Sequence, residues 1–296
     1  MFFQSSHENR SSKAINHHEP KLISLDKKEY IFLSDLAGKV IIIGATPYEE
    51  VISYSLPEIS HSITAILHDT FYNIDTVNGT IHSTNVGNLL DGPDNITWVL
   101  AGEFPKETSY IRSNPAVNGS VIYFVTYSGI LYSYNTKTSV TYKLGNVVQS
   151  YYYASLAVVD KILYIQKYSH FYSFDGTSVR ELTPSETRYY SGLFQLGNEV
   201  CRVGGNNTNV NPDPVSCYNS TSRQWSVRSH INYARRFPGV VTIGLRTYIF
   251  GGVAYGSTNL WIDSVEVLNH ETNLWGFFPT PLTEGQPYVQ ALAFSF

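Results

Sequence analysis

The sequence predicts an all-β fold built from repeated antiparallel units of four strands, and two observations support that prediction. Short runs rich in Val, Ile, Tyr, Phe and Thr recur along the 296 residues, and Gly, Asn, Asp and Pro bound them, as expected for strands joined by turns. Helix-period stretches with caps are hard to find. The second observation is an internal repeat, in which one pattern of strands and turns returns at a near-constant spacing.

The clearest copies of the repeat lie in the last third of the chain, through 201–225 and 248–275. Each reads as an apolar strand that ends in a glycine pair, followed by a strand, a turn and a tryptophan. Paired glycines suit a positive φ, or a place where a side chain would obstruct neighbouring backbone. We therefore expect a structural role for Gly204, Gly205, Trp225, Gly251, Gly252 and Trp275.

Earlier copies are degenerate but in phase. In chain order, the expected second and third strands of each unit are 38–44 with 51–54, 77–81 with 96–98, 118–125 with 130–138, and 160–165 with 171–176. The second strands then centre near residues 43, 81, 124, 164, 203 and 250, a spacing of about 40 residues that is typical of propeller blades. The repeat therefore predicts six units.

At these residues the chain resembles the kelch repeat, whose unit is a four-stranded blade with a Gly-Gly pair after the second strand and a Trp on the fourth. The resemblance implies a six-bladed β-propeller. The segment 288–296 has the phase of a first strand, so we expect it to complete the first blade. Residues 30–36 compete for the same position, and the alternative is an incomplete seven-bladed propeller.

Composition excludes several classes of protein. Only 15% of residues are charged, 43% are apolar and 14% are aromatic, which is the composition of a folded chain. The formal net charge of -4, with no block of Lys or Arg, argues against nucleic acid as a partner. No window approaches the length of an apolar membrane span.

We divide the chain into a polar N-terminal tail, 1–27, and the propeller, 28–296. The tail is expected to be too short for the adaptor module that many kelch proteins carry. Its histidines lack Cys or carboxylates at ligand spacing, so no metal is expected.

No signal peptide is visible, which favours the cytoplasm. The alternative is an extracellular protein. Cys201 and Cys217 fall on neighbouring predicted strands and could form a disulfide if they are in register. Sequons occur at Asn78, Asn95, Asn118, Asn206 and Asn219, roughly the number that chance would give.

The sequence carries no recognisable catalytic motif, so neither an enzyme nor a cofactor is expected. The glycine pairs continue into no phosphate-binding helix, and there is no hydrolase elbow, zinc-binding helix or paired Cys-x-x-Cys. Some kelch-like propellers are copper oxidases with a Cys–Tyr crosslink. Here Cys217 and Tyr218 are adjacent in sequence, so their side chains point to opposite faces of a strand.

The loops before successive first strands carry the candidate partner-binding residues. Aligned on those strands, Tyr110, Tyr151, Arg188 and Arg235 take equivalent positions, flanked by Tyr152, Tyr189, Tyr190 and Arg236. Tyr255 and Trp261 lie on a long loop after a glycine pair. Arg, Tyr and Trp are the residues enriched at binding hot spots. The alternative role of Arg188 and Arg235 is structural, through hydrogen bonds between blades.

The resemblance implies a non-catalytic protein-interaction module, such as a scaffold, adaptor or regulator. We expect it to recognise an acidic or polar segment of a protein partner through loop Arg and Tyr residues. The alternative is a secreted carbohydrate-binding or carbohydrate-acting propeller.

Overall fold

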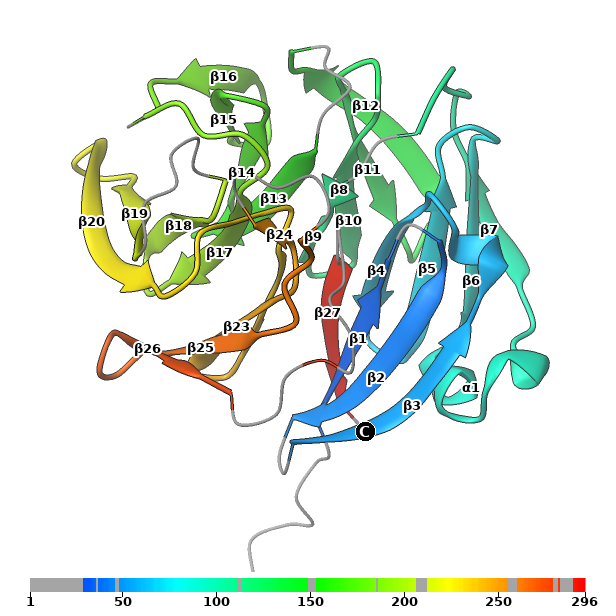
Figure 1. Ribbon diagram of the computed structural model, residues 1–296. Coiled ribbons are helices and arrows are strands. Elements are labelled where there is room, and N and C mark those ends of the chain that lie inside the picture. Colours follow the sequence, from blue (N-terminus) through cyan, green and yellow to red (C-terminus); the bar gives the residue numbers. More distant parts are fainter. Residues whose placement is uncertain are drawn as a thin grey trace, which may run out of the picture.

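The computed structural model describes residues 29–35, 37–45, 48–110, 113–148, 153–184, 186–205, 212–254, 260–278, 282 and 290–295. The predicted tail lies outside the described residues. Those residues form six blades of four antiparallel strands, arranged around a ring as a six-bladed β-propeller, and the short strand β8 (Ser113–Asn114) extends the sheet of one blade (Figure 1). The predicted fold class is confirmed.

Each blade runs from an innermost strand outward. Blade 1 consists of β27 (Gln290–Ser295), β1 (Glu29–Ser34), β2 (Lys39–Ala45) and β3 (Tyr48–Ser55). Blade 2 consists of β4 (Ile63–Leu67), β5 (Thr70–Asp75), β6 (Thr80–Asn85) and β7 (Val99–Glu103). Blade 3 consists of β9 (Ala116–Asn118), β10 (Val121–Val125), β11 (Ile130–Asn135) and β12 (Val140–Asn146).

Blade 4 consists of β13 (Ala154–Val159), β14 (Ile162–Lys167), β15 (His170–Phe174) and β16 (Val179–Leu182). Blade 5 consists of β17 (Gly192–Leu196), β18 (Glu199–Val203), β19 (Asp213–Asn219) and β20 (Gln224–Ile231). Blade 6 consists of β22 (Gly239–Ile243), β23 (Arg246–Phe250), β25 (Val265–Asn269) and β26 (Leu274–Phe277).

Smaller elements lie in the loops. They are β8 (Ser113–Asn114), β21 (Arg235–Arg236), β24 (Val253–Ala254), the short helix α1 (Val86–Leu90) and the 3-10 turns η1 (Pro57–Ile59) and η2 (Pro93–Asn95). Asn85 caps α1, because its side chain accepts a hydrogen bond from the backbone nitrogen of Gly87. No helix among the described residues is long and apolar enough to cross a membrane.

The ring closes through its last strand. β27 pairs antiparallel with β1, with Phe32 opposite Leu292 and Tyr30 opposite Phe294 (Figure 1). β27 is therefore the first strand of blade 1 and β1 the second, so the two segments that competed for one position occupy neighbouring positions. The alternative of an incomplete seven-bladed ring is wrong, because the described residues complete six blades.

Two of the predicted second strands were one strand out of phase. Residues 43 and 81 lie on β2 and β6, which are third strands, whereas β1 and β5 are the second strands of blades 1 and 2. The other four centres lie on or directly beside the second strands of blades 3 to 6. The shift arose because blades 1 and 2 mark the turn after the second strand with a single glycine, Gly38 or Gly79, instead of a pair.

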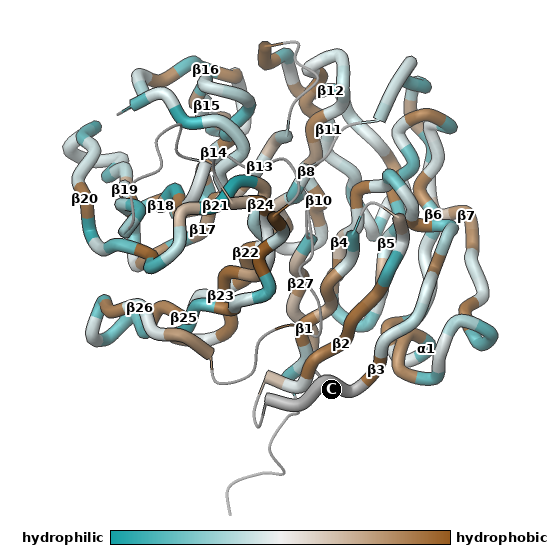
Figure 2. Tube along the Cα trace, viewed as in Figure 1, coloured by the Kyte–Doolittle hydropathy of each residue, from teal (hydrophilic) through white to brown (hydrophobic). Residues whose placement is uncertain are grey.

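Each blade buries both of its faces against its neighbours. In β2, Ile41 and Ile43 pack in a cluster with Phe250 of blade 6, whereas Val40 and Ile42 pack in a cluster with Phe71 of blade 2. Alternate residues of a strand point to opposite faces of the sheet, so an uninterrupted apolar run is what a doubly covered strand requires. Figure 2 shows the same apolar colouring along β1, β2 and β23.

The two ends of the ring carry different loops. One end, which we call the connection face, carries the links between blades and the turns between second and third strands. Backbone hydrogen bonds join the two sets: Leu56 N donates to Gly38 O, Phe104 N to Gly79 O and Val147 N to Gly129 O. The opposite end, which we call the hairpin face, carries the turns between first and second and between third and fourth strands.

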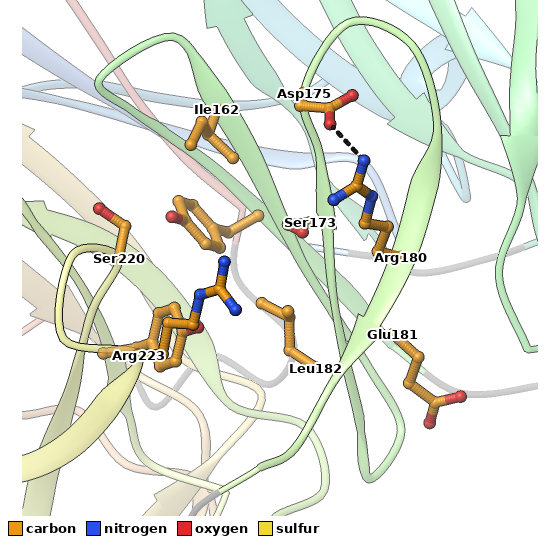
Figure 3. A pocket seen from close by; sticks show the side chains of 10 residues that line it. Ile162, Ser173, Asp175, Arg180, Glu181, Leu182, Ser220 and Arg223 are labelled. Carbon is orange, nitrogen blue, oxygen red and sulfur yellow. Dashed lines mark ion pairs between the residues drawn. The ribbon is translucent and has the colours of Figure 1, made fainter.

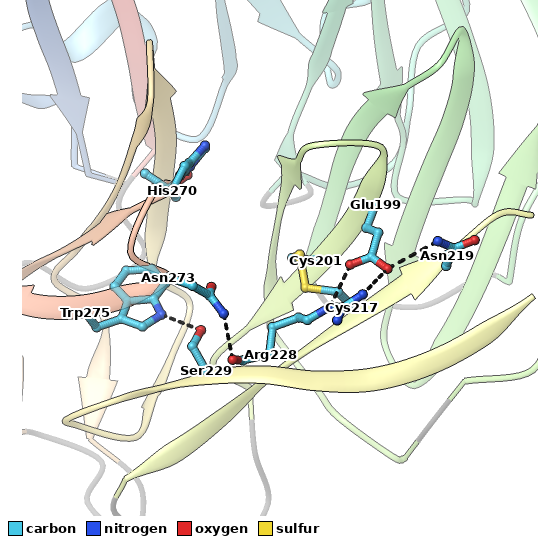
Figure 4. The surroundings of a disulfide bond; sticks show 10 residues. Glu199, Cys201, Cys217, Asn219, Arg228, Ser229, His270, Asn273 and Trp275 are labelled. Carbon is cyan, nitrogen blue, oxygen red and sulfur yellow. Dashed lines mark hydrogen bonds and ion pairs between the residues drawn. A yellow bond between two sulfur atoms is a disulfide. The ribbon is translucent and has the colours of Figure 1, made fainter. Parts of the chain in front are cut away.

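A disulfide bond crosslinks the middle of blade 5. Cys201 on β18 and Cys217 on β19 stand directly opposite each other, and both are fully buried (Figure 4). The register that the sequence required for this bond is therefore present. Beside it, Glu199 binds Arg228 through a pair of hydrogen bonds of 2.8 and 2.5 Å (Figure 4). The compartment of the protein stays a prediction.

The two repeat tryptophans fasten blades together. The Nε1 of Trp225 in blade 5 donates to Thr183 O, just past the end of blade 4, at 3.0 Å. The Nε1 of Trp275 in blade 6 donates to Ser229 Oγ of blade 5, also at 3.0 Å (Figure 4). Each tryptophan therefore joins its own blade to the preceding one.

Candidate interaction surface

The candidate surface is the connection face, where those predicted binding residues that the structure describes lie. Arg188, just before blade 5, is 0% exposed. Its Nε donates to Glu186 Oε1 at 2.7 Å, its Nη1 donates to Gly204 O at 3.0 Å, and Nη1 also lies 3.3 Å from Asp213 Oδ1. A second buried guanidinium, that of Arg202, lies 3.5 Å from Glu186 Oε1. Burial lowers the pKa of Arg202, and the charge of Arg188 lowers it further.

Arg235 repeats this arrangement before blade 6. It is 1% exposed, and its Nη1 donates to Gly251 O and to Ser264 O, both at 3.0 Å. Its Nη2 donates to the buried carboxylate of Glu266 at 2.7 Å. Burial lowers the pKa of Arg235, whereas Glu266 raises it. Glu266 also accepts hydrogen bonds from the backbone of Asn232 and Tyr233, so this buried pair is well satisfied.

These contacts correct the expected mechanism. The side chains of Arg188 and Arg235 are fully buried, so neither can hold an acidic partner segment, and each is bound within its own blade. Hydrogen bonds between blades, which the structural alternative expected, run through the backbone of the same residues: Gly205 N of blade 5 donates to Arg235 O at 2.8 Å, and Gln166 Nε2 of blade 4 donates to Arg188 O at 3.5 Å. In each case the arginine fastens the link before a blade to the glycine turn of that same blade.

The glycine pairs permit this close approach. A Cβ on Gly205 would lie 2.4 Å from Tyr189 O, and one on Gly252 would lie 2.7 Å from Arg236 O. Both glycines also have a positive φ, of 72° and 95°. Conformational freedom and close approach of neighbouring backbone therefore both require glycine at this turn.

A row of aromatic rings crosses the connection face over blades 4 to 6. Ring centroids lie 4.4 Å apart from Tyr168 to Tyr189, 6.2 Å from Tyr189 to Tyr190, 4.0 Å from Tyr190 to Phe237 and 5.9 Å from Phe237 to Tyr153. We call these five residues the aromatic row. Tyr168, Tyr189 and Tyr190 are half-buried, so part of each remains open to solvent, whereas Phe237 and Tyr153 are buried.

Three residues of the aromatic row have a left-handed backbone. The φ angles are 55° at Tyr168, 63° at Tyr190 and 55° at Phe237. Bulky residues rarely adopt this conformation, and residues held in it cluster at functional sites. Tyr190 and Phe237 each stand two residues after a buried arginine, Arg188 or Arg235, so the repeat itself creates the geometry.

Trp261 lies beside the row. Its backbone bridges Val253, which packs in one cluster with Phe237 and Tyr153. The side chains of Trp261 and Leu260 are 53% and 60% exposed, which is high for large apolar groups.

Two further predicted residues lie elsewhere on the same face. Tyr110 is 48% exposed and stacks on His61, with ring centroids 4.7 Å apart, in the links around blade 2. Arg236 is half-buried on β21. The structure therefore brings Tyr189, Tyr190 and Trp261 together and leaves Tyr110 apart from them.

The remaining predicted residues, Tyr151, Tyr152 and Tyr255, lie outside the described residues. The sequence reasoning missed Tyr153, Tyr168 and Phe237. Phe237 could have been found from its offset after Arg235, which equals that of Tyr190 after Arg188. Tyr168 had no comparable signal, because it occupies a turn that lacks the glycine pair.

The chain itself occupies part of the centre of the connection face. β8 pairs in parallel with β13, and its Ser113 O accepts a hydrogen bond from Gln290 Nε2 of β27 at 3.0 Å. Asn114 Nδ2 donates to Tyr153 Oη, which donates to Pro238 O at 3.2 Å. The side chains in this network are at least nine-tenths buried. Among the described residues, β8 and this network therefore occupy part of the centre of the connection face, among the innermost strands.

No group of three or more His, Cys, Asp or Glu residues that could hold a metal ion occurs in the described part of the chain. Burial lowers the pKa of His270, which accordingly favours the neutral form, and its Nε2 lies 2.8 Å from Thr247 Oγ1. The imidazole of His270 is therefore hydrogen-bonded within blade 6.

Comparison with known proteins agrees with the geometry. A family model described as the Kelch motif matches residues 234–281, which cover the link before blade 6 and the blade itself. An F-box/kelch-repeat protein of Arabidopsis thaliana is 26% identical over 113 residues, or 38% of this chain. That match covers 37% of the Arabidopsis protein. The chain therefore carries a Kelch motif at its last blade, and its six blades, glycine-pair turns and inter-blade tryptophans are similar to those of kelch-repeat propellers.

Proposed function

We propose that this propeller is a non-catalytic protein-interaction module that binds a segment of a protein partner on its connection face. The observation that carries the proposal is the aromatic row with Trp261 beside it. Rings that are rigidly held and partly exposed offer a partner large apolar contact area at little cost in conformational entropy. Tyr168, Tyr189 and Tyr190 bring hydroxyl groups as well, which suit hydrogen bonds to a peptide backbone.

Similarity to kelch-repeat proteins supports the proposal, since such propellers commonly act as interaction modules. The match to an F-box/kelch-repeat protein also favours a protein partner. Because Arg188 and Arg235 are buried, we assign the proposed partner contacts to the aromatic side chains and not to these two arginines. The partner segment is accordingly expected to carry apolar or neutral polar groups more than acidic ones.

The test is affinity capture from source-cell lysate followed by binding to the purified partner. The variant Tyr189→Ser/Trp261→Ser removes two partly exposed anchors, and a loss of at least tenfold in affinity is expected. Tyr142→Ser/Leu274→Ser is the matched control, because Tyr142 and Leu274 are 56% and 69% exposed on outer strands. Equal binding by wild type and the Tyr189/Trp261 variant, with both folded, would overturn the proposal.

A further inference from the structure

A cavity of about 280 Å³ lies between blades 4 and 5 on the hairpin face, away from the proposed partner surface (Figure 3). The side chains that shape it come from the second to fourth strands of blade 4 and from the third strand and following turn of blade 5. Ile162, Tyr164 and Leu182 belong to blade 4, and Tyr218, Ser220 and Arg223 belong to blade 5. The cavity is therefore a feature of the interface between blades.

The floor of the cavity is apolar and aromatic. Tyr164 and Tyr218 are 2% and 6% exposed, and their rings meet edge to face with centroids 6.0 Å apart. Both belong to the cluster that Ile162 and Leu182 flank. Burial raises the pKa of Tyr164, and a side-chain hydrogen bond with Ser220 opposes that shift, so the hydroxyl keeps its proton at neutral pH. The floor suits a ligand whose apolar part is flat or short.

Most charges at the rim are already paired. Arg180 Nη2 lies 3.3 Å from Asp175 Oδ2. Hydrogen bonds from the side chain and backbone of Thr177 lower the pKa of Asp175 to about 2, so its carboxylate remains ionised at neutral pH. Glu181 binds His170 Nδ1 at 2.6 Å, and its carboxylate points away from Arg223 (Figure 3).

Arg223 is the exception among these charged residues. Its side chain extends from the β19–β20 turn toward Leu182 across the cavity (Figure 3), and its guanidinium makes no ion pair with any residue in the described ranges. A guanidinium presents five donors in a planar fork that matches a carboxylate or phosphate. The cavity thus holds one uncompensated cation above an apolar floor.

The backbone holds Arg223 in an uncommon conformation. Its φ is 56°, and its nitrogen donates to Asn219 O at 2.8 Å. The equivalent turns of blades 3 and 6 place the short polar residues Ser139 and Asn273 in the same conformation, with φ of 56° and 55°. Either short residue would close the turn, whereas the arginine adds a long cationic side chain at the edge of the cavity.

We propose that this cavity binds a small organic anion, namely a carboxylate or phosphate group carried on an apolar body. Arg223 pairs with the oxyanion, the Tyr164 and Ser220 hydroxyls lie within the same lining, and the rings of Tyr164 and Tyr218 receive the body. This proposal is independent of partner binding on the connection face.

The test is titration of the full chain with phenyl phosphate and benzoate, monitored by calorimetry. We expect saturable binding of at least one probe, at least tenfold weaker binding by Arg223→Gln, and unchanged binding by Lys143→Gln. Lys143 is a suitable control because it is an exposed cation on β12 of blade 3. Benzyl alcohol, which has the ring without the anion, is expected to bind at least tenfold more weakly than phenyl phosphate.

Three results would overturn the proposal. They are no binding of either anion to wild type, equal binding of an anion by wild type and a folded Arg223→Gln, and equal binding of benzyl alcohol and phenyl phosphate. Circular dichroism of Arg223→Gln checks that it is folded. Arg180→Gln provides a second variant on the opposite wall, where a smaller loss is expected because Arg180 already serves Asp175.

Discussion

Lys167 at the end of β14 is a fully buried lysine, 0% exposed. Its Nζ donates to Thr126 O at 2.8 Å, which joins blade 4 to the glycine turn of blade 3. Burial lowers the pKa of Lys167 to about 7, and the charge of Glu107 opposes that shift. The unfolded chain keeps the ordinary lysine pKa of about 10.4, so above pH 7 the unfolded state binds more protons than the folded state.

Stability is therefore expected to rise with pH between about 7 and 9 through this one group, by up to about 1.4 kcal/mol per pH unit. The variant Lys167→Met keeps the volume and removes the titration. Thr126 O keeps a hydrogen bond from Gly129 N, so the variant leaves no orphaned carbonyl there. Urea unfolding at several pH values measures the slope for each protein.

The predicted outcome is a positive slope in wild type that is reduced in Lys167→Met. Parallel pH dependences for the two proteins would show that Lys167 does not titrate in this range. Tyr164 and Tyr172 do not titrate between pH 7 and 9, because burial raises their pKa above the ordinary value near 10.

Single residues also show where sequence reasoning stops. The repeat placed Arg188 and Arg235 correctly before blades 5 and 6, but it could not decide whether they point outward. Their carboxylate partners, Asp213 and Glu266, lie on third strands far along the chain, and a local pattern contains no trace of that pairing. A loop arginine with the features of a binding residue is in this case a structural contact inside the blade.

Among the structural elements, the glycine turn after the second strand recurs in most blades. In blade 3, Gly129 has a φ of 83°, and a Cβ on it would lie 2.5 Å from Val147 O. Gly119 of the same blade has a φ of 59° with nothing within 4 Å of the added Cβ. Both glycines therefore have a positive φ, but only at Gly129 does neighbouring backbone lie where a side chain would be.

The positive φ alone should make alanine at either position cost about 1–2 kcal/mol of stability, because an L-residue is disfavoured in that conformation. Gly129→Ala should cost at least about 1 kcal/mol more than Gly119→Ala, because the link before blade 4 must move as well. The measurement is the free energy of unfolding of both variants in urea. Equal losses would mean that the link yields freely and that the glycine turn does not hold it.

The glycine turns also explain how much of the fold was predictable. The glycine pairs and tryptophans of blades 5 and 6 marked those blades correctly, and the aromatic strands of blades 3 and 4 kept the phase. Blades 1 and 2 carry single glycines, and blade 2 inserts α1 and η2 before its last strand. The repeat therefore predicted the third strands of these two blades as second strands. A search for single glycines at Gly38, Gly79 and Gly129 would have restored the phase.

Closure of the whole ring depends on more than strand pairing. Gln290 of β27 is 9% exposed and connects three parts of the ring. Its Nε2 donates to Ser62 O at 3.1 Å and to Ser113 O at 3.0 Å, and its Oε1 accepts from the nitrogen and hydroxyl of Thr64. One side chain therefore joins the closing strand to blade 2 and to β8.

Gln290→Leu should destabilise the protein by about 3 kcal/mol, because the substitution leaves buried partners without hydrogen bonds. Gln224→Leu is the control, since Gln224 is exposed on β20, and a change within about 0.5 kcal/mol is expected. Urea unfolding monitored by tryptophan fluorescence measures both. A Gln290 variant as stable as the control would show that β27 is held by its strand pairing with β1 alone.

The assembled ring also determines what the candidate surface can do. Stacking six blades brings Tyr168, the link residues Tyr189 and Tyr190, and Phe237 from three different blades into one row. The sequence predicted Tyr189 and Tyr190 but not this row, because the row forms only when neighbouring blades are in place. The proposed function therefore belongs to the connection face of the ring rather than to any one repeat.

Site-specific photo-crosslinking can show whether partners bind on the connection face. A photo-reactive phenylalanine derivative is placed at position 261 in one protein and at position 142, on the outer strand of blade 3, in another. Each is illuminated in source-cell lysate. We expect a discrete crosslinked protein from position 261 and none from position 142, whereas crosslinks from position 142 alone, or from neither position, would contradict binding on this face.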